Sequence, residues 1–126
     1  MLRQLIDWNR RRKQWNADHV AAWRGISDHD QSGLSPFQYR CEQRLVDALR
    51  VAGYIVANRQ IKGPEGARYI SGSVVHGPVT FWLHDDTVGY DVGAASRRFE
   101  EWDYRTPDEL IEDFCRLLIE AVRAAA

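Results

Sequence analysis

The chain has 126 residues, with 17 basic and 18 acidic side chains and a net charge of −1. This length predicts a single domain, residues 1–126, that buries a hydrophobic core without disulfide staples. A nearly neutral chain is not expected to be a general nucleic-acid or membrane binder, because both surfaces attract strongly basic proteins. We therefore expect no nucleic-acid partner and no membrane partner.

The charges are unevenly placed along the chain. Residues 1–63 hold 11 basic and 6 acidic side chains, a difference of +5, and residues 64–126 hold 6 and 12, a difference of −6. The two halves either form two oppositely charged surfaces or interleave in the fold, and we favour interleaving.

The two cysteines, Cys41 and Cys115, each lie among apolar neighbours in a predicted helix. This setting favours reduced, buried thiols over a disulfide between the helices. Charged side chains interrupt residues 1–13 where a signal peptide needs an apolar core. No apolar run approaches the ~20 residues of a membrane span. We therefore expect a cytoplasmic protein.

Residues 2–24 have a helical pattern. Arg12 falls where the near-heptad spacing requires an apolar residue, so the pattern predicts a break at residues 16–18. The tryptophans of this segment either pack into the core or form an aromatic and basic surface for a partner. They are Trp8, Trp15 and Trp23.

The polar composition of residues 25–35 predicts a loop. Together with the preceding helix it forms an N-terminal segment, residues 1–34, ahead of the core. The run Asp28–Gly33 resembles the start of a calcium-binding loop, whose twelfth position should be a bidentate glutamate. That position is Tyr39. We therefore interpret the run as a linker and expect no metal site.

The core, residues 35–126, begins with a predicted helix over residues 36–52. Ser35 is a suitable N-cap, Pro36 fits the first helical position, and Gly53 fits the position just after the helix. The apolar spacing predicts a buried stripe on this helix. Its members are Phe37, Cys41, Leu45, Val46 and Leu49.

Four strands follow, the first from Tyr54 to about Ile61 and three more within residues 68–91. A turn at Asp85–Asp86 and a two-residue turn at Gly77–Pro78 predict the strand register. The predicted pairs are Leu83 with Val88, Phe81 with Tyr90, Val79 with Val92, Val74 with Phe81, and Gly72 with Leu83. This register gives one apolar face, extended by Ile70 and His76, and an opposite face with Thr80, Trp82, His84, Thr87, Gly89 and Asp91.

The pattern of residues 97–104 is compatible with a fifth edge strand and with an extended loop. Residues 106–123 then predict a helix that begins with a capping box, in which Thr106 caps the helix and Glu109 occupies the third helical position. The fold class is therefore α+β: an antiparallel four- to five-stranded meander, with N-terminal helices and a C-terminal helix packed on it.

The run His84–Thr87 is the most enzyme-like cluster, because an imidazole beside two carboxylates can bind a metal or transfer protons. Paired aspartates at a hairpin tip are also ordinary turn formers, and we favour that interpretation. The sequence has no nucleophile, phosphate-loop or metal-ligand motif. We therefore expect no catalytic residue, no cofactor and no enzyme activity.

Trp82 is predicted opposite Gly89, where the indole covers bare backbone. If no helix covers Trp82, its indole is an exposed anchor of the kind found at protein interfaces. Acidic residues lie nearby in the sequence and form, with the aromatics, a candidate surface for a protein partner. The candidate site is Trp82, Asp85, Asp86, Glu100, Glu101, Trp102 and Asp103.

The stretch WLHDDTVGYDVGAASRRFEEWDYRTPDELIEDFCRLL resembles small bacterial immunity proteins of polymorphic toxin systems over residues 79–118. In these families a strand ending in Tyr-Asp precedes an aromatic-acidic segment and a Pro-Asp-Glu-Leu helix start. The resemblance implies a protein that occludes the active site of a cognate toxin. We expect the acids to mimic the anionic substrate of the toxin and the aromatics to supply the buried anchors. Two alternatives are a secretion chaperone or adaptor that uses the tryptophan-rich helix, and a small enzyme that uses His84, Asp85 and Asp86.

Overall fold

The structure is a computed structural model that describes residues 2–23 and 33–125. Within residues 2–23 it describes the side chains of residues 3, 6–15 and 17. Residues 25–32 of the predicted loop 25–35 and the side chains of Asp18 and Trp23 lie outside the described residues. The described elements are α1 (Leu2–Trp23), α3 (Pro36–Val51), β1 (Val56–Lys62), β2 (Tyr69–Val74), β3 (Val79–Leu83), β4 (Thr87–Val92), β5 (Ala95–Glu100), the 3-10 helix η1 (Glu101–Asp103) and α4 (Pro107–Ala125).

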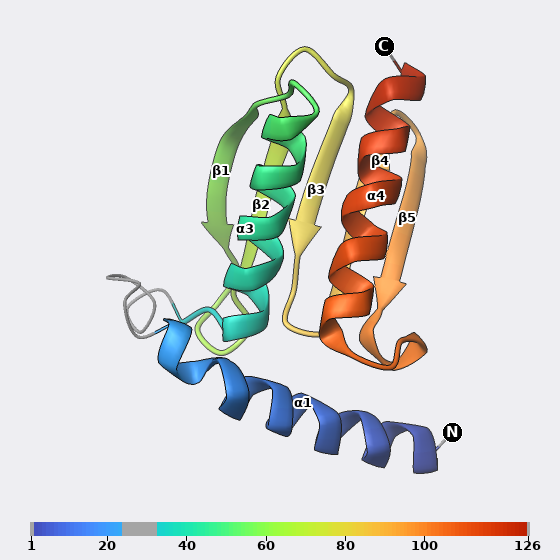
Figure 1. The fold of residues 1–126 in the computed structure, drawn as a ribbon. Coiled ribbons are helices and arrows are strands. Elements are labelled where there is room, and N and C mark those ends of the chain that lie inside the picture. Colours follow the sequence, from blue (N-terminus) through green and yellow to red (C-terminus); the bar gives the residue numbers. More distant parts are fainter. Residues whose placement is uncertain (1, 24–32, 126) are drawn as a thin grey trace.

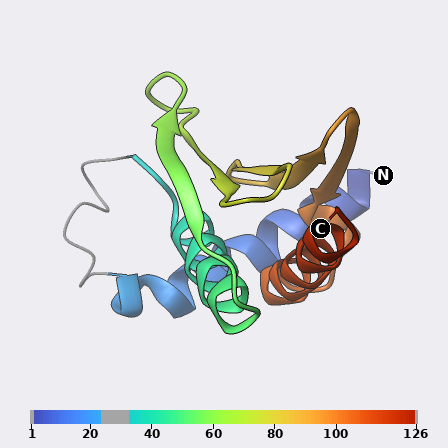
Figure 2. The same ribbon diagram turned by 90° about the horizontal axis from the view of Figure 1, so that it is seen from above.

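The five strands form one antiparallel meander in the order β1-β2-β3-β4-β5. Helices α3 and α4 lie side by side on one face of this sheet, and α1 crosses the end at which both of these helices begin (Figures 1 and 2). The predicted fold class is confirmed, with five strands and α4 packed on the sheet.

Helix α3 begins and ends where local chemistry predicts. The Ser35 side chain accepts a hydrogen bond from the Gln38 amide, and the Gln38 side chain accepts one from the Ser35 amide, which forms a capping box. At the other end Gly53 has a φ of 93°, and the amide of Tyr54 donates to the carbonyl of Leu49. This is a Schellman motif, which satisfies the last carbonyls of the helix.

The predicted β3–β4 register is confirmed at all three pairs. The predicted β2–β3 register is wrong by two residues, because Gly72 pairs with Phe81 and Ile70 with Leu83. The connection spans residues 75–78, and its left-handed position is occupied by His76, with a φ of 62°. A slip of two residues leaves side chains on their predicted faces, since the faces alternate with period two. The exception is His76, which is exposed in the turn and not on the apolar face.

Residues 97–104 begin as the predicted fifth edge strand and continue as a 3-10 helix, which neither predicted possibility included. The edge strand β5 pairs with β4 without a break from Thr87–Glu100 to Val92–Ala95, and the chain then turns through η1. The chain thus leaves the sheet at Glu101, and the amide of this residue donates to the carbonyl of Asp86 in the β3–β4 turn.

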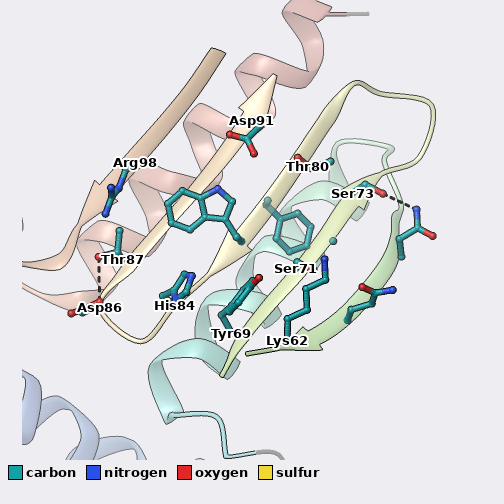
Figure 3. A pocket seen from close by; sticks show the side chains of 15 residues that line it. Lys62, Tyr69, Ser71, Ser73, Thr80, His84, Asp86, Thr87, Asp91 and Arg98 are labelled. Atoms are coloured by element: carbon teal, nitrogen blue, oxygen red, sulfur yellow. Dashed lines mark hydrogen bonds between the residues drawn. The ribbon is translucent and has the colours of Figure 1, made fainter. Parts of the chain in front are cut away.

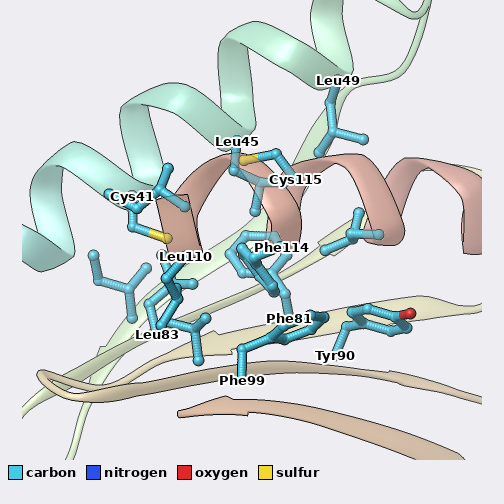
Figure 4. Close-up of a cluster of buried hydrophobic side chains, with 14 of the residues drawn as sticks. Cys41, Leu45, Leu49, Phe81, Leu83, Tyr90, Phe99, Leu110, Phe114 and Cys115 are labelled. Atoms are coloured by element: carbon cyan, nitrogen blue, oxygen red, sulfur yellow. The ribbon is translucent and has the colours of Figure 1, made fainter. Parts of the chain in front are cut away.

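The core lies between the sheet and helices α3 and α4 (Figure 4). Four of the five residues predicted for the α3 stripe are fully buried, but Val46 is 37% exposed. Both cysteines are buried and unbridged. Burial raises the pKa of the Cys41 thiol, and it raises that of Cys115 to about 12. Neither side chain is therefore suited to act as a reactive thiolate.

Helix α1 is continuous, so the predicted break at residues 16–18 is wrong. Arg12, the residue that interrupts the apolar pattern, is only 7% exposed. Its charge is paired with Glu101 and Asp85, which belong to the acidic half of the chain. The basic and acidic halves therefore interleave at this point, as they do where Arg44 pairs with Glu112.

Candidate functional site: the open face of the sheet

One face of the sheet carries no described helix (Figure 2). We call it the open face, and it is hollowed into a groove of about 1010 Å³. A row of paired residues crosses all five strands at its centre, with Trp82 in the middle of the row. The row consists of Gln60, Ser71, Trp82, Gly89 and Arg98.

Aromatic rings run from the centre of the open face, at Trp82, to its end at the β3–β4 turn. His84 stacks on Tyr69 with ring centroids 4.3 Å apart and planes 19° apart, and it meets the edge of Trp82 at 5.8 Å. These rings come from β2, from β3 and from the residue after β3, and Figure 3 shows the Tyr69 and His84 side chains side by side. Stacked and edge-to-face rings supply large contact areas with little conformational freedom left to lose.

Trp82 is held in place by the glycine opposite it. A Cβ at Gly89 would lie 2.2 Å from Cζ2 of Trp82, so only glycine lets the indole lie on the strand. The guanidinium of Arg98 lies 6.0 Å from the indole centroid on the other side of this glycine. The predicted pairing of Trp82 with Gly89 is confirmed, and the tryptophan is only partly buried.

Charged side chains lie around these rings. Lys62 stands on β1, Asp91 on β4 and Arg98 on β5, and Asp86 lies in the β3–β4 turn (Figure 3). Two positive and two negative groups line the groove, so its formal charges cancel. Ser71, Ser73 and Thr80 supply hydroxyl groups between the rings and β1. The open face therefore has an aromatic centre, a hydroxyl-bearing floor and a charged rim of both signs.

Outside the open face, two of the acids predicted for the site, Asp85 and Glu101, meet Arg12. This guanidinium donates to the buried carboxylate of Glu101, and to the carboxylate and the backbone carbonyl of Asp85 at 2.6 and 2.7 Å. Burial raises the pKa of Glu101 from its ordinary value of 4.5 to about 7, although the Arg12 charge opposes this shift. Glu101 is 1% exposed, so it cannot contact a partner.

The structure divides the seven predicted site residues among three places. Trp82 and Asp86 line the open face, and Glu100 stands at its edge, where it accepts hydrogen bonds from Thr87 and Arg98. Asp85 and Glu101 are paired with Arg12. Trp102 and Asp103 lie in η1, away from the groove lining. The burial of Glu101 removes this residue from the surface that the sequence predicts, and of the other six only Trp82 and Asp86 line the groove.

The N-terminal tryptophans with described side chains contact their own chain. Trp15 is 6% exposed; its ring meets Phe37 at 6.2 Å, and its indole donates to Asp108 at 3.2 Å. Trp8 meets Trp102 edge-to-face at 5.8 Å, and Trp102 remains 38% exposed. Trp8 and Trp15 therefore fasten α1 to the body of the domain.

The predicted His84–Thr87 cluster does not converge on one point. The amide of His84 donates to the carbonyl of Thr87 at 2.9 Å, which closes a turn. His84 and Asp86 line the groove, whereas Asp85 turns toward Arg12, and His76 is not part of the lining. Among the described residues, no three His, Cys, Asp or Glu side chains are grouped so that they could hold a metal ion.

Sequence reasoning missed several residues of the open face, including Lys62, Tyr69 and Arg98. They lie on β1, β2 and β5, and only the register brings all three to one face. The partnership of Arg12 was also missed. Its signal was present, since Arg12 breaks the apolar pattern of α1, and a charge at a core position requires a buried partner.

Comparisons with protein-family models, curated proteins and solved structures found no match. Within the described part of the chain, no helix has the length and apolar character needed to cross a membrane.

Proposed function

We propose that this protein binds a cognate bacterial toxin and neutralises it, as immunity proteins do, by placing its open face against the toxin. The observation that carries the proposal is a five-stranded sheet face that no described helix covers, with an aromatic centre inside a charged rim. Protein interfaces commonly have this anatomy, and their binding energy concentrates on a few central aromatic side chains. The resemblance of residues 79–118 to immunity proteins supports the same class.

The rim indicates what kind of surface the partner presents. Lys62 and Arg98 lie among Asp86, Asp91 and, at the edge, Glu100, which pairs with Arg98, so a partner surface with charges of both signs fits better than a strongly basic one. Mimicry of an anionic substrate by the acids, which the sequence led us to expect, therefore has less support. Two of the acids expected to mimic a substrate, Asp85 and Glu101, are already paired with Arg12. Inhibition would therefore be mainly steric, with the toxin's active site blocked by the body of the domain.

The two alternatives have less support. A chaperone that holds its client with the N-terminal tryptophans would need them free, and Trp8 and Trp15 are engaged with Trp102 and Phe37. A small enzyme would need convergent groups. His84 is stacked on an aromatic ring, and the neighbouring Asp85 is bound to an arginine.

Tagged protein purified from its native organism tests the proposal. We expect wild-type protein to retain one stoichiometric partner, whose C-terminal domain is toxic when expressed alone. Thr80→Arg places a long charged side chain on an exposed position of the open face and should lower the affinity at least about tenfold, because it blocks close contact across the groove.

Gln43→Arg is the matched control, since it adds the same side chain to an exposed position of α3 on the opposite side of the sheet. This variant should bind as the wild type does. Equal binding by both arginine variants, with both folds intact, would remove the open face from the proposal. A clean monomer without any partner would count against the immunity function and make His84 the next residue to substitute.

A further inference from the structure

Arg12 joins four separate parts of the fold. From α1 it donates to Glu101 in η1, to Asp85 in the β3–β4 turn and, at 3.5 Å, to the Ser35 hydroxyl at the start of α3. Its guanidinium also lies 4.5 Å from the centroid of the Phe37 ring. An arginine can do this because its planar fork carries five donors, whereas lysine presents a single compact ammonium group.

The β3–β4 turn that Arg12 holds is also one end of the open face. Asp85 accepts two hydrogen bonds from Arg12, through its carboxylate and its backbone carbonyl. Its neighbours on either side, His84 and Asp86, both line the groove. The Asp86 carbonyl accepts from the Glu101 amide at 3.1 Å, so η1 supports the turn from the same side as Arg12.

We propose that Arg12 is a positioning residue for the open face, so that the docking of α1 and the geometry of the β3–β4 turn form one cooperative unit. The reason is that Asp85 is exposed and Asp86 partly exposed, so the turn is held by hydrogen bonds and not by burial. Besides those of Arg12, they include the Glu101 amide to the Asp86 carbonyl and the Thr87 hydroxyl to Glu100. Within the turn itself, the described hydrogen bonds are the His84–Thr87 closure and the contact of the Thr87 hydroxyl with Asp86. Loss of Arg12 would also leave the buried Glu101 carboxylate without its cation, so this group would have to take up a proton or move toward solvent with η1.

A consequence follows for binding, and this step rests on the proposed function. If a partner contacts His84 or Asp86, its affinity depends on whether α1 is docked, although α1 itself lies outside the groove lining. By linkage, a bound partner would in turn stabilise the docked α1. Helix α1 would then act as a remote regulator of the open face.

Hydrogen exchange of the full-length chain tests the positioning role without any partner. Arg12→Lys keeps the charge but removes the fork, and exchange of the amides in both residues 84–87 and α1 should become about tenfold faster or more. The amides of α4 and of the β2–β3 pairs should keep their protection. Arg10→Lys, at an exposed position of the same helix, should change neither segment.

The ring resonances of His84 provide a second readout, which a role confined to holding α1 would not affect. They should shift in Arg12→Lys and stay unchanged in Arg10→Lys. Faster exchange in α1 with an unchanged turn and unchanged His84 resonances would overturn the proposal. If Arg12→Lys loosens the whole domain, Asp85→Asn keeps the backbone contact and weakens only the charged one, and the turn should still exchange faster than in wild type.

Different results would contradict the role of Arg12 and the proposed binding of a toxin. The absence of any partner for wild-type protein would leave the exchange and resonance results intact. Conversely, a partner that binds Arg12→Lys and wild type equally would overturn the coupling, even if Thr80→Arg abolishes binding.

Discussion

At the scale of single residues, Gly89 determines how Trp82 lies on the open face. Gly89→Ala would bring a methyl group to 2.2 Å from the indole and to 2.6 Å from the carbonyl oxygen of Arg97. The backbone atom cannot move away easily, so the ring and the strand must both shift. We expect a loss of about 1–3 kcal/mol in the free energy of unfolding, measured by urea denaturation.

Gly77→Ala is the matched control for that substitution. Its added methyl would meet Val74 at an ordinary 3.7 Å, and Gly77 does not have a positive φ. This variant should stay within about 0.5 kcal/mol of wild type. Equal costs for the two glycines would mean that Trp82 is not held against the strand at Gly89.

The sequence predicted contacts correctly where the two residues are close together in the chain. The pairing of Trp82 with Gly89 follows from a short turn, and it is confirmed. The role of Glu101 could not be predicted in this way, because its partner Arg12 is 89 residues away. An acid that reads as a surface residue in the sequence is thus one of the most deeply buried groups of the domain.

At the scale of elements, Gln38 fastens the start of α3 to the sheet. Its side-chain amide donates to the carbonyls of Arg68 at 2.8 Å and Leu83 at 3.0 Å, and its oxygen accepts from the Ser35 amide at 2.8 Å. The side chain is 1% exposed, and all three contacts are to backbone groups.

We expect Gln38→Leu to lower the free energy of unfolding by about 2–4 kcal/mol, because a side chain of similar size leaves three backbone groups without their partner. Thermal or urea unfolding would measure this loss. Gln43→Leu, the same substitution on the exposed face of the same helix, should change it by less than about 0.5 kcal/mol. A Gln38 variant as stable as the Gln43 variant would show that these hydrogen bonds contribute nothing net.

At the scale of the whole molecule, the buried Glu101 predicts how stability depends on pH. Its pKa is about 7 in the folded protein, against an ordinary value of 4.5. The folded state therefore binds an extra proton between these two values, and stability falls as the pH rises from 4.5 to 7. The charged groups that act on Glu101 are Arg12, which opposes the shift, and Asp85 and Asp86, which add to it.

Glu101→Gln removes this titration, so we expect the wild type to lose stability relative to the variant between pH 5 and pH 8. The loss should reach up to about 3 kcal/mol, since each unit of pKa shift corresponds to about 1.4 kcal/mol. Urea denaturation of both proteins at the two pH values measures it. The exposed Glu65→Gln should track the wild type at both pH values. A stability difference between wild type and Glu101→Gln that is the same at pH 5 and pH 8 would contradict the prediction.

The sequence by itself determined the local elements of this protein. Capping residues placed α3 and the start of α4, and alternating side chains separated the two faces of the sheet even though the β2–β3 register was wrong by two residues. These features depend on contacts within a few positions of each other, where side-chain chemistry and backbone geometry act directly.

Only the tertiary structure decided which candidate residues share a surface. The seven predicted site residues look contiguous as a pattern of acids and aromatics, but the fold places Trp82 and Asp86 in the groove, pairs Asp85 and Glu101 with Arg12, and buries Glu101. The physical reason is that burying a charge requires a partner of opposite charge. Which acid meets Arg12, and which aromatic ring stays uncovered, depends on how α1 crosses the sheet and its helices, and no local pattern contains that information.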